Sequence, residues 1–210
     1  MWEEPCISGT RGSGTVFFTG CVLKCVFCQN SVLAESKVGK PVTVSRLAEI
    51  FLELQNKGAH NINLVTPTHF VPSIRESIIL SKKNGLSVPI VYNTGSYESV
   101  DTIKSLEGLV DIYLPDLKYV SSELSKKYSK VPDYFEVARK AIDEMVRQTG
   151  TSEFDDDGIM KKGVIVRHLL LPGCLSDSKN VIKYLYDTYR DDIFISIMNQ
   201  YTPCLLYTSP

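Results

Sequence analysis

Short apolar runs alternate with segments of helical periodicity along most of this 210-residue chain. The runs have the length and composition of strands, and the segments between them repeat apolar residues every three or four positions. Strands that are each followed by a helix run parallel, because the helix returns the chain to the same edge of the sheet. We predict strands over residues 15–19, 61–65, 89–92, 110–114, 164–171 and 193–198.

The helical segments between these strands carry ordinary end signals. One apolar stripe, at 47–54, stops at Gly58, and a second segment opens near Pro72 and stops at Gly85. Further stripes cover 134–145 and 181–189. Six strand–helix units are too few for a closed eight-unit barrel. We therefore expect an α/β fold in which parallel strands form an open, partial (βα)6 barrel.

The chain is long enough for one domain with a sizeable core, and no linker or repeat divides it. We expect a single domain over residues 1–203. Residues 204–210 offer no further element, so we expect an unstructured tail that is typical of a truncated chain. The acidic stretch within 151–162 is interpreted as a solvated turn.

Charge and hydropathy exclude several function classes. Twenty-three basic and 24 acidic side chains leave a formal net charge of −1, which gives no support for nucleic-acid binding. No apolar run approaches the roughly 20 residues that span a bilayer. The first residues lack the basic and apolar regions of a signal peptide. We therefore expect a cytoplasmic protein without a membrane partner.

Three of the six cysteines follow the first predicted strand, at the spacing CxxxCxxC: Cys21, Cys25 and Cys28. Four cysteines close every iron of a ferredoxin cluster, whereas three leave one iron open for another ligand. Zinc is an alternative, with a fourth ligand from His60, His69 or His168. Unmetallated structural cysteines are another, although three thiols on one short loop make that reading poor.

The cysteine motif, with Phe27 before its third cysteine, is similar to that of the radical S-adenosylmethionine (SAM) superfamily. The resemblance is greatest to the branch related to pyruvate formate-lyase activating enzymes. It extends over residues 4–203. Besides residues 21–30, it is carried by Tyr92-Asn93-Thr94-Gly95, by Asp116-Leu117-Lys118, and by Arg167 with Leu171-Pro172-Gly173.

This resemblance implies a radical oxidoreductase with a [4Fe–4S] cluster on Cys21, Cys25 and Cys28 and with S-adenosyl-L-methionine as cofactor. In the family, the reduced cluster cleaves SAM and releases a 5′-deoxyadenosyl radical that abstracts a hydrogen atom. The resemblance also implies a flavodoxin- or ferredoxin-type electron donor. A glycyl radical enzyme-like protein substrate would make the chain an activase.

Several residues are implied as cofactor contacts, each with an ordinary structural alternative. Phe27 would lie by the adenine or pack in the core. Asn93 and Thr94 would face the polar end of SAM or form a strand-terminal turn. Asp116 and Lys118 share one face of a strand, so they would bind the SAM carboxylate or ribose, or simply pair with each other.

Arg167 is a charge among apolar residues, and a buried arginine must be paired with a carboxylate of the cofactor or of the protein. Gln200 follows the last predicted strand and would rim the adenine site. Activating enzymes carry Gly-Gly-Glu after the second strand, but residues 63–69 here read Asn-Leu-Val-Thr-Pro-Thr-His. Thr66 or Thr68 would then accept the bond from the SAM amino group. This departure points to a less characterised side branch rather than to pyruvate formate-lyase as substrate.

Two other function classes compete with a radical enzyme. An iron–sulfur electron-transfer or metal-binding module would hold a cluster without SAM turnover. A zinc hydrolase would show no visible absorption after reconstitution with iron and sulfide. Cofactor binding separates these classes, because an electron carrier has no need to bind SAM.

Overall fold

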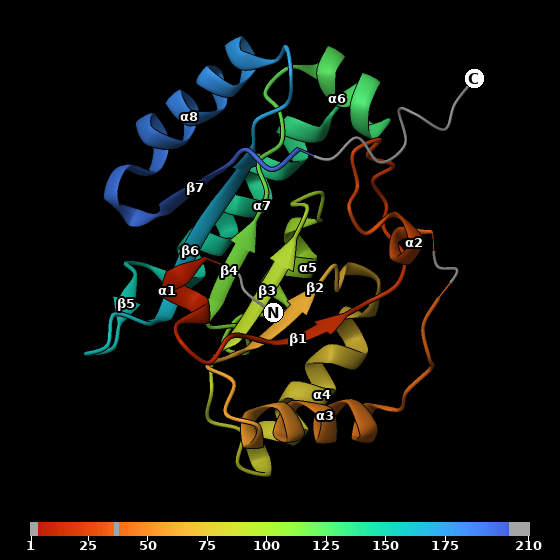
Figure 1. Ribbon diagram of the computed structural model, residues 1–210, viewed down its shortest axis with the longest axis vertical. Coiled ribbons are helices and arrows are strands. Elements are labelled where there is room, and N and C mark those ends of the chain that lie inside the picture. The colour runs from red at the N-terminus through yellow and green to blue at the C-terminus, as the bar shows by residue number, and fades with distance from the viewer. Residues whose placement is uncertain (1–3, 36–37, 202–210) are drawn as a thin grey trace.

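The computed structural model describes residues 4–35 and 38–201, so the tail predicted for 204–210 lies outside the described residues. Apart from the two-residue β5, strands and helices alternate as the sequence predicts, and the arrows of β1, β2, β3 and β4 in Figure 1 point to one common edge. The strands are β1 (Gly14–Phe17), β2 (Ile62–Val65), β3 (Ile90–Thr94), β4 (Ile112–Pro115), β5 (Glu153–Phe154), β6 (Met160–Leu169) and β7 (Phe194–Met198). The helices are α1 (Pro5–Ser8), α2 (Ser31–Ala34), α3 (Val44–Asn56), α4 (Val71–Lys83), α5 (Val100–Lys104), α6 (Ser122–Ser129), α7 (Tyr134–Thr149) and α8 (Leu175–Tyr189), with 3₁₀ turns η1 (Thr68–Phe70) and η2 (Arg190–Asp192).

The sheet has the order β1-β2-β3-β4-β6-β7, and all of these neighbours pair in parallel. No pairing joins β7 back to β1 within residues 4–35 and 38–201, so the curved sheet stays open between its first and last strands. This arrangement confirms the predicted α/β fold with a partial barrel of parallel strands. Because the strands are parallel, their carboxyl ends meet at one edge, where ligand sites of such sheets form.

Local signals explain where the longer helices begin and end. The Thr43 side chain accepts a hydrogen bond from the Arg46 N–H at 3.1 Å and caps the start of α3. That helix ends just before Gly58, whose φ of +88° is in the left-handed region. Ser121 caps α6 in the same way, and Lys130 ends it with a φ of +66°.

The prediction of a solvated turn over 151–162 is wrong in part. Its centre is a tight turn, in which the Asp155 carboxylate accepts hydrogen bonds from the N–H groups of Asp157 and Ile159 at 3.1 and 2.8 Å. Its flanks, however, form an antiparallel hairpin of β5 with β6. The two residues of β5 are both exposed, so no apolar pattern revealed this strand. Helices α1, α2, α5 and α6 were also not predicted, because all of them are short or lack a long apolar stripe.

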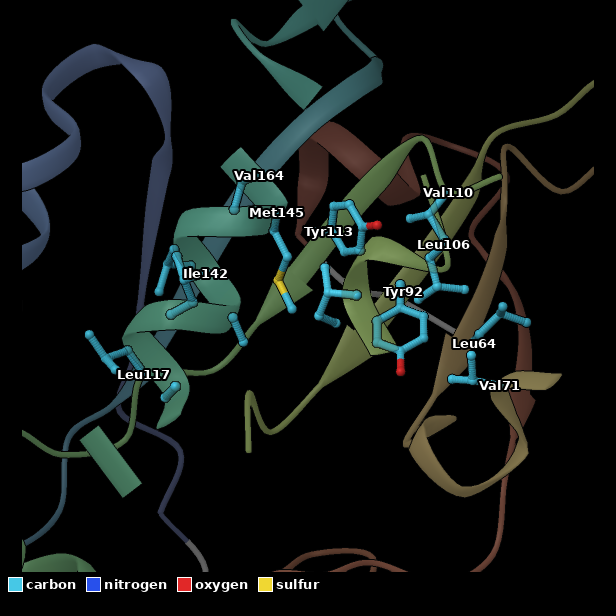
Figure 2. Close-up of a cluster of buried hydrophobic side chains, with 14 of the residues drawn as sticks. Leu64, Val71, Tyr92, Leu106, Val110, Tyr113, Leu117, Ile142, Met145 and Val164 are labelled. Carbon is cyan, nitrogen blue, oxygen red and sulfur yellow. The ribbon is translucent and has the colours of Figure 1, made fainter. Parts of the chain in front are cut away.

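The outer face of the sheet packs against the helices through a large apolar core. Tyr92 on β3 and Tyr113 on β4 lie within it, together with Ile142 and Met145 of α7, and Figure 2 shows Met145 beside Tyr113. All of these side chains are fully buried. Full burial of such a side chain stabilises the fold by roughly 1.5–3 kcal/mol. This core therefore holds the strands and helices in register behind the site.

The amino-terminal half of the inner face is also apolar. We call it the floor, and it consists of Ile7, Val91, Ile112, Leu114, Met160 and Ile165. Helix α1, which carries Ile7, lies in front of the strands in Figure 1. Asn61 donates to the Ile7 carbonyl at 3.0 Å and fixes that helix in place. The floor seals the inner space from below and leaves its other end open. Among the described residues, no helix has the length and apolarity needed to cross a bilayer.

Candidate functional site

A cavity of about 570 Å³ opens at the carboxyl ends of the strands. A volume of this order is typical of pockets for cofactors and other small molecules. Every predicted cluster ligand lines this one cavity, and so does every predicted cofactor contact except Thr68, the alternative to Thr66. The lining includes Cys21, Cys25, Phe27, Cys28, Thr66, Asn93, Thr94, Asp116, Lys118, Arg167 and Gln200.

The cysteine loop connects β1 to α2 and is anchored by backbone hydrogen bonds. The Cys28 N–H donates to the Cys25 carbonyl at 3.1 Å, which forms a tight turn around Phe27. Cys25 is buried, whereas Cys21 and Cys28 are half-buried and border the cavity. Burial raises the pKa of the Cys21 and Cys28 thiols, and the neighbouring Cys25 raises both further. A bound cation would favour the thiolate forms of Cys21 and Cys28, as at a metal-binding loop.

The arrangement of the cysteine side chains differs from that of a site for a single ion and is compatible with a cluster. In the part of the chain that the structure describes, no three His, Cys, Asp or Glu side chains converge on one point as the ligands of one ion must. Each thiolate of a four-iron cluster binds a different iron, so the three sulfurs can stand apart around the cluster. His168, one predicted zinc ligand, is buried and donates to the Leu117 carbonyl at 2.8 Å. His60 lies at another place, beside Arg11 at 3.0 Å.

Polar and charged side chains at the ends of β3, β4 and β6 form another part of the cavity lining, which we call the charged wall: Asn93, Asp116, Lys118 and Arg167. The Asp116 carboxylate lies 2.6 Å from Lys118 Nζ and accepts from Arg167 Nε at 2.9 Å. Arg167 also donates to the Asn93 side-chain oxygen at 2.7 Å. Burial raises the pKa of Asp116, but Arg167 and Lys118 outweigh that effect and hold it below its ordinary value. Asp116 thus stays ionised and holds both cations on the cavity wall.

Phe27 of the cysteine loop and Lys118 of the charged wall lie close to each other. Lys118 Nζ lies 6.0 Å from the centre of the Phe27 ring. At that separation the ring faces a cation, which is attracted to its π electrons. Phe27 is also buried and packs edge-on against Tyr119. Phe27 therefore lines the cavity and packs in the core at the same time, so the core contact leaves the predicted contact with the cofactor open.

Thr66 and Gln200 lie at the ends of two other strands. Thr66 follows β2 with a φ of +57°, which is uncommon for a β-branched residue and marks a constrained turn at the cavity. The Gln200 carbonyl accepts a hydrogen bond from the Gln29 side chain at 3.2 Å, which links the end of β7 to the cysteine loop. Thr68, the alternative to Thr66, is not part of the cavity lining and donates to Glu98 at 2.7 Å.

Two buried residues that position the site were missed in the sequence. One Glu98 carboxylate oxygen accepts hydrogen bonds from Thr94 at 2.6 Å and from Tyr92 at 3.1 Å, besides the one from Thr68. The Tyr134 hydroxyl donates to the carbonyls of Asp116 and Gly95, at 2.7 and 3.0 Å. Tyr134 belongs to the apolar stripe that predicted α7, but a stripe carries no information about a hydroxyl at its tip.

Comparisons with known proteins agree with this geometry. Residues 15–154 match the radical SAM superfamily. An uncharacterized protein of Methanocaldococcus jannaschii is 30% identical over 200 residues, which are 91% of this chain and 54% of that protein. A pyruvate formate-lyase-activating enzyme of Staphylococcus epidermidis is 23% identical over 180 residues, 80% of this chain and 65% of that enzyme.

Among solved structures, Streptococcus suis SuiB matches 90% of this chain and 40% of its own, with a TM-score of 0.60 and 16% identity. That likeness shows the fold alone. The chain spans about half to two thirds of the length of the curated relatives it matches. The family match runs from the second residue of β1 to the end of β5 and includes the cysteine loop and three of the four residues of the charged wall, Asn93, Asp116 and Lys118. This chain belongs to the radical SAM superfamily.

Proposed function

We propose that this chain is a radical enzyme that holds a [4Fe–4S] cluster on Cys21, Cys25 and Cys28 and binds S-adenosyl-L-methionine in the adjoining cavity. The observation that carries the proposal is that the cysteine loop and the charged wall line one and the same cavity. When bound, the reduced cluster and SAM would supply a 5′-deoxyadenosyl radical for hydrogen-atom abstraction.

The residues present suit both groups. Three thiolates leave one iron of a four-iron cluster without a protein ligand, which is the position a chelating cofactor would take. SAM carries a carboxylate, an amino group, a ribose and an adenine. The cavity offers cations for the carboxylate and an aromatic ring for the adenine. Hydroxyl and carbonyl oxygens can accept hydrogen bonds from the amino group and the ribose.

Each wall residue has a proposed role. Arg167 and Lys118 attract the SAM carboxylate, and Asp116 keeps their head groups in place. Thr66 and Thr94 present hydroxyl groups to the polar end of the cofactor. Glu98 holds the Thr94 hydroxyl in one orientation.

The adenine contacts and the exclusion of water fall to other parts of the cavity. Phe27 and Gln200 border the adenine. Leu23, Val65 and Leu169 are apolar parts of the wall and would keep water from the reacting atoms. Hydrogen-atom abstraction needs no general base, and we assign none.

We also propose a protein substrate for the radical and a small one-electron carrier of the flavodoxin or ferredoxin type as reductant. Support comes from the resemblance of the cysteine motif to that of activating enzymes and from the name of the Staphylococcus epidermidis relative. Because residues 63–69 lack Gly-Gly-Glu, we place the substrate outside pyruvate formate-lyase itself.

Product analysis tests the proposal. The protein is reconstituted anaerobically with iron and sulfide, reduced with dithionite and incubated with SAM, and 5′-deoxyadenosine and methionine are quantified by chromatography. We expect both products in equal amounts from the native sequence, and none from Cys28→Ala. The matched control is Cys174→Ala, since Cys174 is also half-buried but lies outside the cavity lining. A protein that holds the cluster yet releases neither product would favour an electron-transfer module.

A further inference from the structure

A buried hydroxyl lies directly behind one cysteine of the loop. Ser129, the last residue of α6, has 0% of its surface exposed, and its Oγ lies 3.0 Å from the Cys25 Sγ. The Tyr119 hydroxyl, on a residue that is only 1% exposed, lies 3.1 Å from the same Oγ. We propose that Ser129, supported by Tyr119, is a positioning residue that donates a hydrogen bond to the cluster thiolate of Cys25 and raises the reduction potential of the cluster.

This inference rests on the proposed function, because it requires the cluster on Cys25. A metal-bound cysteine has lost its proton and can only accept, so the Ser129 hydroxyl must be the donor. Its oxygen is then free to accept from the Tyr119 hydroxyl. The two hydroxyls form a short relay that ends on the sulfur, and each donor polarises the next in this buried environment.

The backbone holds this relay in place. The N–H of Lys24 donates to the Ser129 carbonyl at 3.3 Å, and that of Val26 donates to the Tyr128 carbonyl at 2.9 Å. These carbonyls belong to the last turn of α6, where carbonyl groups have no N–H partners within the helix. The cysteine loop thus completes the helix end, and this docking sets the distance between the hydroxyl and the sulfur.

The three cysteines consequently differ in their surroundings. The backbone N–H groups of Leu23 and Asn30 lower the pKa of Cys21 and Cys28 respectively, against the effect of burial. Cys25 has a side-chain donor, which a single substitution can remove. The reduced cluster carries one more negative charge, part of which resides on the thiolates, so a donor stabilises the reduced form more than the oxidised form. Removing the donor should make the cluster harder to reduce.

The test is an anaerobic redox titration of the reconstituted protein without SAM, with the reduced-cluster signal followed by electron paramagnetic resonance. We expect Ser129→Ala to lower the equilibrium constant for one-electron reduction by up to about tenfold, or about 59 mV. Tyr119→Phe should shift it in the same direction by less. Ser125→Ala is the matched control: Ser125 is buried on the same helix, but its hydroxyl donates to the Ser122 carbonyl at 3.1 Å.

Each outcome decides the inference. An unchanged potential in Ser129→Ala, or an equal shift in Ser125→Ala, would overturn it. If Ser129→Ala fails to hold a cluster, Tyr119→Phe decides, because it leaves the serine in place and must still lower the potential. Ser129→Thr keeps a hydroxyl and should restore most of the native value. Failure of the proposed function is distinguishable, since a native protein without a cluster or without SAM cleavage would reveal it independently of these shifts.

Discussion

The two ends of the inner face of the sheet differ in polarity, although the same strands form both. At the amino end, the floor is apolar and covered by Ile7 of α1. At the carboxyl end lies the charged wall of the cavity, which we call the rim in this comparison. It consists of Asn93, Asp116, Lys118 and Arg167. A strand alternates its side chains between faces but places no limit on how polarity changes along one face. The apolar contacts that stabilise the fold are therefore concentrated in the floor and outer core, whereas the proposed chemistry lies at the rim and the cysteine loop.

Loss of a loop cysteine should have the largest effect on cluster binding and little effect on stability. Cys28→Ala should abolish cluster binding while the unfolding free energy of the cluster-free protein changes by about 1 kcal/mol or less, since Cys28 is half-buried. Iron content and visible absorption after reconstitution measure the first effect, and urea unfolding measures the second. A variant with full iron content would remove Cys28 from the ligand set.

Within the rim, Asp116→Asn should cost stability as well as cofactor binding. The Asp116 side chain is 16% exposed and lies 2.6 Å from Lys118. Removing one partner of a buried ion pair costs about 3–5 kcal/mol, because the remaining charges stay buried. The control is Asp187→Asn, which breaks a pair of the same 2.6 Å length whose carboxylate is 53% exposed. Well under about 1 kcal/mol is expected there. Equal losses in urea unfolding would contradict this account of the rim.

The contribution of Asp116 should also depend on pH in one direction. Its pKa in the folded protein is below the ordinary value of 3.8. The stabilisation is therefore fully present above pH 3.8 and is lost as the pH falls through the folded-state value. The difference in unfolding free energy between the native protein and Asp116→Asn should shrink in acid. A difference that grows below pH 3.8 would show that the cations do not control this carboxyl group.

Substitution in the floor should do the opposite of substitution in the cysteine loop. Ile7→Ala should lower the unfolding free energy and leave iron content unchanged. Burial of Ile7 is complete, and truncation of such a side chain costs about 2–5 kcal/mol. Its helix has only four residues and can shift into the space, so we expect the lower end of that range. Ile142→Ala, within the outer core on the long helix α7, should lie at the upper end. Loss of iron from Ile7→Ala would mean that floor and rim are coupled.

Glu98→Gln should have the smallest effect on stability. Burial raises the pKa of Glu98, so the folded state favours the protonated acid, and its stabilisation is lost as the pH rises above the ordinary value of 4.5. Glutamine keeps an oxygen for Thr94 but carries no charge. The variant should match the native protein within about 1 kcal/mol at pH 4.5 and gain relative to it at pH 8. A relative gain at low pH instead would show that the native carboxylate is stabilised in the fold.

The sequence predicted those residues of the cavity whose types and spacing are characteristic of a cofactor site. Three features can be recognised in the sequence: three cysteines on one loop, an Asp-x-Lys at a strand end, and an arginine among apolar residues. Because parallel strands bring their carboxyl ends to one edge, strand order alone was enough to bring these residues to one cavity. The strands that frame the cavity were predicted with shifts of a few residues.

What remained hidden depends on contacts between distant segments. Ser129 and Cys25 are 104 residues apart, and a serine at a helix end is common enough to carry no signal. Glu98 is one of many acidic residues, and only the packing around β3 shows that it is buried. The direct Asp116–Arg167 contact was left open in the sequence, where a ligand carboxylate was an equal partner for the arginine.

The most direct test of a cluster that shares its cavity with SAM is electron paramagnetic resonance of the reduced, reconstituted protein with and without SAM. We predict a reduced-cluster signal that shifts when SAM is added and that is absent in Cys28→Ala. Arg167→Gln, which removes one proposed partner of the SAM carboxylate, should keep the signal but require more SAM for the shift. A cluster signal that SAM leaves unchanged would contradict the assignment of the cavity and favour an electron carrier.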